Sequence, residues 1–435
     1  MDKRDLDARL RVLQDADLNN KVVLVRVDHN VVKKGRIKDP YRIDATIGTL
    51  YAIAKKGGKP ILMTHVGRPK DKNSGRISCV EDQSVLPIVR YLEQKLPLKI
   101  HVPEFPIDPE KGITHIDESI RPAIDDLKKG IVDMIYLPNS RWFQGEQAKG
   151  AEKDTFAEEL AGLADLYIND AFGSWQSHVS TYDIATRLPS FSGILLQKEL
   201  SNLRRVLEPE RPFTAVIAGA KYDTKIGPLK AIYSKVDYLI LGGLMYSTFL
   251  SAKYGVSIQG VSEEDRNLAL ELVDLDRRDN KILDMPYLVE SDTMEGKIEG
   301  QYREIELKTL KERQSVGFLL DIAPASFLES RAKEAIGGAK TLFVNAVMGL
   351  MPWFFEGSEA LYREIVSNES AGKLFGGGDT LQEFKNLCPG AYMSGIDEPQ
   401  TYYFTGGGSV LAAIERGTPY DLDPIKALLN EDTSR

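Results

Sequence analysis

The stretch VVLVRVDHN at Val22–Asn30 decides the fold class, because a β-branched run passes directly into small polar residues. A continuous apolar run of this length indicates a strand buried on both faces, which is typical of parallel sheets. Seven further runs end in glycine, small polar or cationic residues. These endings are His65–Lys70, Asn139–Arg141, Asn169–Gly173, Gly219–Lys221, Gly242–Met245, Asn345–Gly349 and Gly376–Thr380.

Strand and helix patterns alternate along the chain with few hairpin signals, which predicts an α/β fold with helices wrapping parallel sheets. A chain of 435 residues exceeds one ordinary core of about 100–200 residues, so we expect two domains. Gln197–Glu208 has helical apolar spacing and predicts a connecting helix. The expected strands are Lys21–Val27, Pro60–Thr64, Lys99–Val102, Met134–Leu137, Leu166–Ile168, Thr214–Ala218, Tyr238–Leu241, Lys281–Leu288, Thr341–Val344 and Lys373–Phe375.

Composition limits the class of protein. Hydrophobic residues make up 42% and charged residues 28%, as in a soluble globular protein, and the net charge of −8 argues against a nucleic-acid binder. Met1–Leu10 lacks the apolar core of a signal peptide, and the apolar stretch near Tyr238–Leu250 is too short to span a bilayer. Cys79 and Cys388 are far apart and form no zinc or disulfide pattern. A cytoplasmic enzyme without a membrane or nucleic-acid partner is expected.

Cationic and polar side chains follow the strands of the first half. Because the carboxyl ends of parallel strands share one edge, where ligands bind, we expect these side chains to meet there. Arginine matches phosphate and carboxylate through a planar fork of donors. The alternative is that they are unrelated surface charges. The set is Asp28, Asn30, Arg42, His65, Arg68 and Arg141.

The second half offers lysines, bare backbone and an acid. Lys221 and Lys225 follow a strand four residues apart, so on a helix they would share one face near its N-terminus, where phosphate binds. The glycines Gly376–Gly378 let backbone approach a phosphate closely. Asp379 beside them suits Mg²⁺, and Thr380 is expected to cap the next helix.

Other nucleotide-binding classes are disfavoured. The sequence contains no GxxxxGK[ST] loop and no GxGxxG followed at the right distance by an acid, which argues against P-loop and nicotinamide-dependent enzymes. The protein-kinase signature set is also absent.

Several motifs occur in an order that resembles the phosphoglycerate kinase family, over residues from about 20 to 410. They are LVRVDHNVV with YRI, THVGRPK, NSRWFQGE, LYINDAFG, AGAKYDTKIG, VNAVMG, FGGGDT and a late TGGG. The resemblance implies two Rossmann-like three-layer domains, a helix hinge and a tail that returns to the first domain. The implied boundaries are 1–196 for the phosphoglycerate domain, 197–208 for the connecting helix, 209–404 for the nucleotide domain and 405–435 for the tail.

The resemblance also implies a reaction and roles. A phosphoryl group would pass reversibly between 1,3-bisphosphoglycerate and ADP, giving 3-phosphoglycerate and ATP with Mg²⁺, in a cytoplasmic monomer of glycolysis and gluconeogenesis. Asp28, Asn30, Arg42, His65, Arg68 and Arg141 would bind the phosphoglycerate, with Arg42 also contacting the transferred group. Lys221 would steady that group. The implied nucleotide residues are Gly219, Lys221, Lys225, Gly243, Asn345, Gly377, Gly378 and Thr380, with Asp379 as the metal ligand.

The chain departs from the family pattern at several positions. Gln176 stands nearest an expected arginine, and Leu244 replaces a glycine at the expected base pocket. Pro352 stands where a ribose-binding glutamate is expected, with Glu356 as a possible substitute. Two alternatives therefore stay open: an acyl-phosphate kinase with altered substrate or nucleotide preference, and a binding or regulatory protein without turnover. Segments 70–76, 103–118 and 292–308 indicate insertions or irregular structure with no assigned role.

Overall fold

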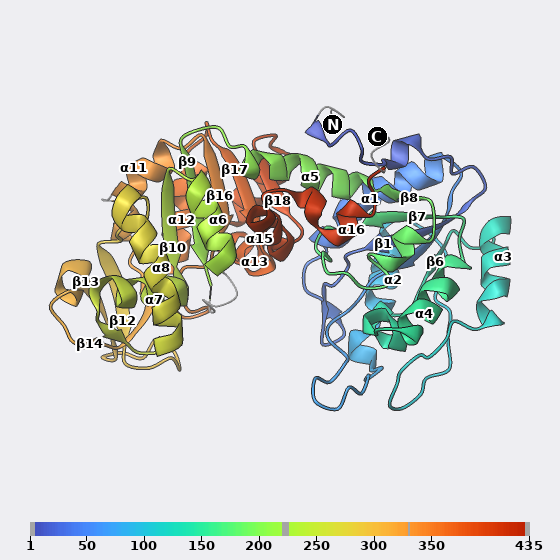
Figure 1. Cartoon of the computed structure of the whole chain (residues 1–435), viewed down its shortest axis with the longest axis horizontal. Helices are drawn as coiled ribbons and strands as arrows, with labels where there is room; N and C mark the ends of the chain where they lie inside the picture. Colours follow the sequence, from blue (N-terminus) through green and yellow to red (C-terminus); the bar gives the residue numbers. More distant parts are fainter. Residues whose placement is uncertain (1–4, 220–225, 329–330, 431–435) are drawn as a thin grey trace. The chain divides into compact units, whose positions relative to one another are not determined.

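The computed structural model describes residues 5–219, 226–328 and 331–430 (Figure 1). The chain divides into two compact units: unit 1 comprises Met1–Ser201 and Tyr420–Arg435, and unit 2 comprises Asn202–Pro419. Mostly parallel sheets flanked by helices build both units, so the predicted α/β class is confirmed. None of the helices in the described ranges has the length and apolar character needed to cross a membrane.

Unit 1 is organised by a six-stranded parallel sheet in the order β5-β6-β4-β1-β7-β8. The opening stretch of sequence supplies β1, and all of its residues are buried, as a strand covered on both faces requires. The strands are β1 (Val22–Val27), β4 (Lys59–Met63), β5 (Ile100–His101), β6 (Met134–Tyr136), β7 (Leu166–Asp170) and β8 (Ser190–Ser192). The longer helices are α1 (Tyr41–Lys55), α2 (Leu86–Lys95), α3 (Arg121–Lys129) and α4 (Ala151–Ala161).

The core of unit 1 is formed where β1 meets its neighbours. Val25 lies opposite Leu62 of β4 and Ile168 of β7, and all three are fully buried. Burying such a side chain contributes about 1.5–3 kcal/mol. Ile53 on the apolar face of α1 packs into the same cluster. The parallel register therefore carries the polar residues that follow β1, β4 and β6 to one edge of the sheet.

Unit 2 contains a five-stranded parallel sheet in the order β10-β9-β16-β17-β18. Its strands are β9 (Phe213–Ala218), β10 (Tyr238–Gly242), β16 (Thr341–Asn345), β17 (Gly372–Gly376) and β18 (Thr401–Phe404). Its helices include α6 (Ile226–Lys235), α7 (Gly243–Tyr254), α8 (Glu263–Asp279), α10 (Ala325–Leu328), α11 (Arg331–Gly337), α12 (Glu356–Ser367), α13 (Gly378–Leu387), α14 (Pro389–Asp397) and α15 (Gly407–Arg416).

A three-stranded antiparallel sheet interrupts this pattern in unit 2. It consists of β12 (Tyr287–Ser291), β13 (Tyr302–Glu306) and β15 (Phe318–Ile322), in the order β13-β12-β15. The expected strand Lys281–Leu288 was misplaced: regular pairing begins only at Tyr287, and Ile282 makes a single bridge to Leu239. Segment 292–308, which looked irregular, supplies β13.

The boundaries of the units differ from those expected. Helix α5 (Ile194–Leu207) begins in unit 1 and ends in unit 2, so the helix expected at 197–208 is present and continuous with both units. The expected tail 405–435 is divided, because 405–419 with α15 belongs to unit 2. The end of the described chain joins the start of unit 1, where the Arg11 amide donates to the Leu428 carbonyl at 3.0 Å and Leu10 bridges Leu429.

Candidate functional site

The predicted polar residues of unit 1 gather at the carboxyl edge of its sheet. Asp28 and Asn30 follow β1, and Arg42 lies in the first turn of α1, where its Nη1 lies 3.3 Å from Asp28 Oδ2. His65 and Arg68 follow β4, and Arg141 follows β6. We call these six residues the unit 1 edge. Five of them follow three neighbouring strands and Arg42 lies in α1, which explains why no short motif contains them all.

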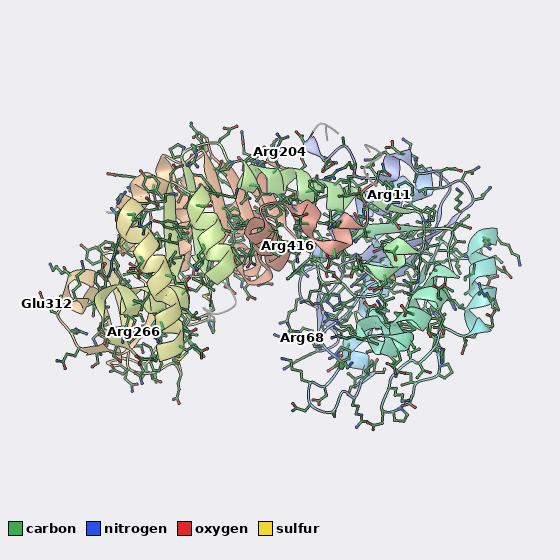
Figure 2. All side chains as sticks on the ribbon, viewed as in Figure 1. Arg11, Arg68, Arg204, Arg266, Glu312 and Arg416 are labelled. Carbon is green, nitrogen blue, oxygen red and sulfur yellow. The ribbon has the colours of Figure 1, made fainter. Side chains whose placement is uncertain are left out.

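The loop after β4 is held by side chains from both neighbouring strands. Asn30 Oδ1 accepts from the Gly67 amide at 2.9 Å, and Arg141 Nη1 donates to the Gly67 carbonyl at 2.6 Å. Buried Asn139 makes two further bonds to the backbone of Val66. The loop therefore has a fixed path, and Arg68 at its end is exposed (labelled in Figure 2).

A buried arginine that sequence reasoning missed fixes the state of His65. Arg26 in β1 is 1% exposed, and its Nη2 lies 3.0 Å from His65 Nδ1. Because a guanidinium only donates, Nδ1 must accept, and the ring proton is on Nε2. Burial, reinforced by Arg26 and Arg141, holds the pKa of His65 well below its usual range, so the ring is neutral.

A buried carboxylate balances Arg26. Arg26 Nε donates to Ser180 Oγ at 2.9 Å, and Ser180 Oγ donates to Glu146 Oε1 at 2.5 Å. The Ser180 amide also donates to Glu146 Oε2. Burial raises the pKa of Glu146, while Arg26 and these hydrogen bonds oppose that rise. The buried cation is thus linked through the Ser180 hydroxyl to a buried carboxyl group, which offsets part of the cost of burying its charge.

His29, the third residue of VDHN, points into the core rather than toward a ligand. Thr46 Oγ1 donates to the Ile43 carbonyl, so it accepts from His29 Nε2 at 3.0 Å. Nδ1 then accepts from the Tyr136 hydroxyl at 2.9 Å. Burial lowers the pKa of His29 to about 3, so the ring stays neutral and ties α1 to the end of β1.

Two atoms of the unit 1 edge lack a hydrogen-bond partner among the described residues: Asp28 Oδ1, an acceptor, and Arg141 Nε, a donor. Unsatisfied buried polar atoms are rare and mark places where a ligand or solvent completes the bonding. His178 lies near this edge, and burial together with Arg141 lowers its pKa to about 4. Gln176, at the position nearest the expected arginine, is exposed, and its carbonyl accepts from Thr181 Oγ1.

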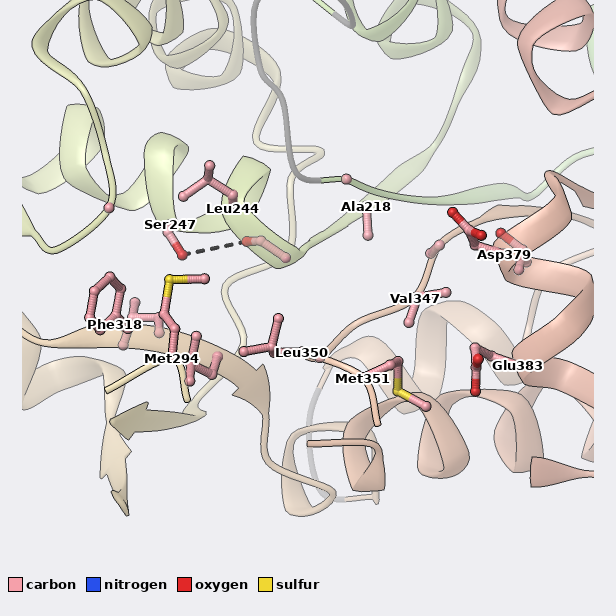
Figure 3. Close-up of a pocket in the computed structure, with 18 of the residues that line it drawn as sticks. Ala218, Leu244, Ser247, Met294, Phe318, Val347, Leu350, Met351, Asp379 and Glu383 are labelled. Carbon is pink, nitrogen blue, oxygen red and sulfur yellow. Dashed lines mark hydrogen bonds between the residues drawn. The ribbon is translucent and has the colours of Figure 1, made fainter. Parts of the chain in front are cut away.

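Unit 2 contains a cavity of about 700 Å³ at the carboxyl edge of its sheet (Figure 3). Four of the predicted strand endings line it, namely Gly219, Gly243, Asn345 and the run Gly377–Thr380. They follow or end β9, β10, β16 and β17, which are adjacent in the sheet. The predicted Lys221 and Lys225 lie outside the described residues.

The glycine end of the cavity is tightly built. Gly377 has φ +111°, and a Cβ there would lie 2.9 Å from Asn345 Nδ2. Asn345 Nδ2 donates to the Gly376 carbonyl at 2.6 Å, so its side chain braces the loop. Thr380 does not cap α13 as expected: α13 begins at Gly378 with Gly377 before it, and Thr380 lies buried inside the first turn.

The opposite end of the cavity is apolar. Leu244, Met294, Phe318 and Leu350 line it, and Figure 3 shows them apart from Asp379. Leu244, expected at the base pocket, is therefore present in the lining. The sequence offered Glu356 as a substitute for the expected ribose-binding glutamate. Glu356 is absent from the described lining of the cavity, and its carboxylate pairs with Lys297.

The described residues that line the cavity offer a metal ion two carboxylates, those of Asp379 and Glu383. The described ranges contain no group of three or more His, Cys, Asp or Glu side chains arranged around an ion. Mg²⁺ characteristically uses one or two carboxylates together with substrate phosphates. Asp379, which lies beside Gly377 and Gly378, fits that pattern.

An arginine-rich sheet edge and a glycine-lined cavity of about 700 Å³, each in its own α/β unit, are compatible with a phosphotransferase that has two substrates. The phosphoglycerate kinase family model matches residues 13–416. Phosphoglycerate kinases from Moorella thermoacetica and Dictyoglomus turgidum are 35% and 33% identical over 412 and 409 residues, covering 93% of this chain and 95% of each relative. The chain therefore belongs to the phosphoglycerate kinase family, and it is an ATP-binding kinase of glycolysis.

Solved structures agree with this assignment. The phosphoglycerate kinase of Coxiella burnetii superposes with a TM-score of 0.72 at 25% identity, covering 96% of this chain and 98% of that chain. The structure from Pyrococcus horikoshii, at 22% identity and the same TM-score, supports the fold.

Proposed function

We propose that the unit 1 edge binds the phosphoglycerate and that the unit 2 cavity binds Mg²⁺–ADP or Mg²⁺–ATP. The reaction would be reversible phosphoryl transfer from 1,3-bisphosphoglycerate to ADP, giving 3-phosphoglycerate and ATP. The observation that carries the proposal is the contrast between the two sites. One presents Arg42, Arg68 and Arg141, and the other presents bare glycine backbone beside Asp379.

The unit 1 edge offers donors and an acceptor that match a phosphoglycerate. His65 Nε2 carries the proton that Arg26 excludes from Nδ1, and Arg141 Nε lacks a partner among the described residues. Both can donate to carboxylate or phosphate oxygens. Asp28 Oδ1 is an acceptor without a described partner, and the substrate hydroxyl is a donor. Arg68 adds an exposed positive charge.

Phosphoryl transfer depends mainly on positioning and on neutralising charge. Arg42 is held by Asp28 through one nitrogen and would contact the transferred group with the others. Lys221, outside the described residues, would stabilise the same group in the transition state. Asp379 would hold Mg²⁺, which neutralises phosphate charge when bound. We include in the proposal a hinge closure that excludes water.

One coupled assay tests the proposal. Purified protein with Mg²⁺, ATP and 3-phosphoglycerate should release ADP, and omission of 3-phosphoglycerate should abolish that release. Replacement of 3-phosphoglycerate by other carboxylates, and of ATP by GTP, tests whether substrate preference is altered. Binding of both substrates without ADP release would contradict the proposal. A cytoplasmic location and a monomeric state also belong to it, and sedimentation velocity tests the latter.

A further inference from the structure

A buried carboxyl group lies directly behind one side of the unit 2 cavity. Asp321 belongs to β15, is 5% exposed and is not among the residues that line the cavity. The residue before it, Leu320, does line the cavity, as do Gly349 and Leu350 from the loop between β16 and α12. We call Gly349 and Leu350 the cavity wall. Asp321 is therefore placed to act on the site through its neighbours.

Asp321 ties the start of α12 to β15. Its Oδ2 accepts from the Gly357 amide at 3.0 Å, and its Oδ1 accepts from the Ile322 amide at 2.8 Å. Gly357 is the second residue of α12, where amides have no carbonyl partner within the helix and favour a negative charge. Removal of the carboxyl group would take away the acceptor of this buried amide.

The cavity wall is attached to the same two elements. A Cβ on Gly349 would lie 2.6 Å from the carbon of the carboxyl group, so only glycine allows the wall to approach this closely. The Leu350 amide donates to the Leu320 carbonyl of β15 at 2.9 Å. The Met348 amide donates to Ser358 Oγ of α12 at 2.9 Å. A shift of α12 away from β15 would therefore move the wall.

The carboxyl group changes charge near neutral pH. Burial raises the pKa of Asp321 to about 7, with Glu356 acting in the same direction, while the two amides and Lys297 oppose the rise. Charged side chains on the elements packed against β15 make ion pairs of their own. These are Glu356 with Lys297 and Glu359 with Arg363 for α12, Glu290 with Arg303 and Arg313 for β12, and Lys253 with Asp284 for α7.

We infer that Asp321 is a positioning residue for the nucleotide: by holding the first turn of α12 against β15, its carboxylate keeps Gly349 and Leu350 where they form the cavity wall. Hydrogen bonds to an ionised acceptor are about twice as strong as neutral ones, so ionisation should hold the wall more firmly. The inference rests on the proposed function, in which this cavity binds Mg²⁺–ATP. Direct repulsion between the carboxylate and ATP would have the opposite effect on affinity, so the two effects can be told apart.

Calorimetric titration of Mg²⁺–ATP into the wild type, Asp321→Asn and Asp276→Asn tests the inference at about pH 6, 7 and 8, which bracket the pKa of Asp321. Asp321→Asn keeps an acceptor of the same shape but has no charge at any pH. Asp276 is the matched control, because it is a buried carboxyl group of unit 2 that accepts from the Lys281 and Ile282 amides and lies outside the cavity lining. The ratio of each variant's Kd to that of the wild type at the same pH removes the titration of ATP itself.

Asp321→Asn should bind Mg²⁺–ATP as well as the wild type at about pH 6 and about three- to tenfold more weakly at about pH 8. Asp321→Ser, a second neutral variant, should show the same change, and melting temperatures check that both variants fold. Asp276→Asn should follow the wild type throughout. Equal or tighter binding by Asp321→Asn at about pH 8, or the same pH response in Asp276→Asn, would overturn the inference.

Turnover separates this inference from the proposed function. Wild-type phosphorylation of 3-phosphoglycerate, with an Asp321→Asn to wild-type Kd ratio that does not change with pH, would reject the role of Asp321 and keep the function. A ratio that rises with pH as expected, in a protein that binds Mg²⁺–ATP without phosphorylating 3-phosphoglycerate, would support the role of Asp321 and reject the function.

Discussion

Arg26 Nη2 lies 3.0 Å from Nδ1 of His65, and this contact determines which ring nitrogen of His65 can donate to a ligand. A buried guanidinium stays protonated and can only donate, so Arg26 keeps His65 in the tautomer that carries its proton on Nε2. The paired Glu146 and Ser180 keep Arg26 in place from the other side. A buried guanidinium, linked to Glu146 through Ser180, thus prepares a donor at the sheet edge.

The roles of the two ring nitrogens of His65 can be tested separately by substitution. In His65→Asn, Oδ1 replaces Nδ1 and still accepts from Arg26, whereas the Nε2 donor is lost. We expect a melting temperature close to that of the wild type and a KM for 3-phosphoglycerate raised about three- to tenfold. His65→Leu leaves Arg26 Nη2 without this partner and should also lose about 1–3 kcal/mol of stability. Equal melting temperatures for both variants would contradict the Arg26 contact.

Arg68 offers a test of anion binding without disturbing the core. It is exposed, so Arg68→Ala should leave the free energy of unfolding within about 0.5 kcal/mol of the wild type. Loss of a charged partner should raise the KM for 3-phosphoglycerate about tenfold or more. Arg90 is an exposed residue of α2, and Arg90→Ala makes the same change in net charge and should leave KM unchanged. Steady-state kinetics of both variants measure the KM for 3-phosphoglycerate and test this expectation.

Alanine substitutions at the adjacent glycines Gly377 and Gly378 should differ in their effects on stability and on ATP affinity. A Cβ on Gly378 meets nothing within 4 Å, so Gly378→Ala should fold normally while its methyl group projects into the nucleotide cavity. We expect ATP affinity to fall with little change in melting temperature. Gly377→Ala is strained at φ +111° and should cost about 1–3 kcal/mol of stability. Gly390→Ala, also in open space, is the control for both measurements.

Asp170 at the end of β7 should make stability depend on pH. Burial raises its pKa from 3.8 to about 6 in the folded protein, and its Oδ2 has no partner among the described residues. Since the native state holds this proton more tightly than the unfolded state, its stabilising contribution is complete below about pH 4 and declines up to about pH 6. Asp170→Asn should therefore gain on the order of 3 kcal/mol relative to the wild type across this window.

Thermal unfolding of both proteins at several pH values between 4 and 7.5 measures this gain. Above pH 6 the difference in free energy of unfolding between Asp170→Asn and the wild type should be constant. A difference that shrinks with rising pH would show that the carboxylate is stabilised by folding, contrary to its burial.

Lys221 is the residue for which the proposal predicts the largest kinetic effect. Lys221→Ala should lower kcat on the order of 10²-fold or more, as loss of a transition-state donor does. The melting temperature supplies the check on folding. Lys333→Ala, an exposed lysine on α11, is the charge-matched control. Near wild-type kcat in Lys221→Ala would remove the central element of the proposed mechanism.

Much of this architecture was predictable from the sequence. Apart from Arg26, the run at Val22–Val27 is apolar on both faces, and that composition is typical of a strand covered on both sides, so the parallel sheet followed. The residues just after the strands were also predictable, because the register of a parallel sheet brings all carboxyl ends to one edge. Asp28, His65 and Arg141 meet there for that reason.

Only the tertiary structure decided which side chains act through partners distant in sequence. Arg26 and His65 are 39 residues apart, and nothing local in either segment indicates a contact. His29 turned out to bind Tyr136 across the sheet rather than a ligand. Periodicity encodes local structure and burial, whereas hydrogen-bond partners arise only when distant segments pack.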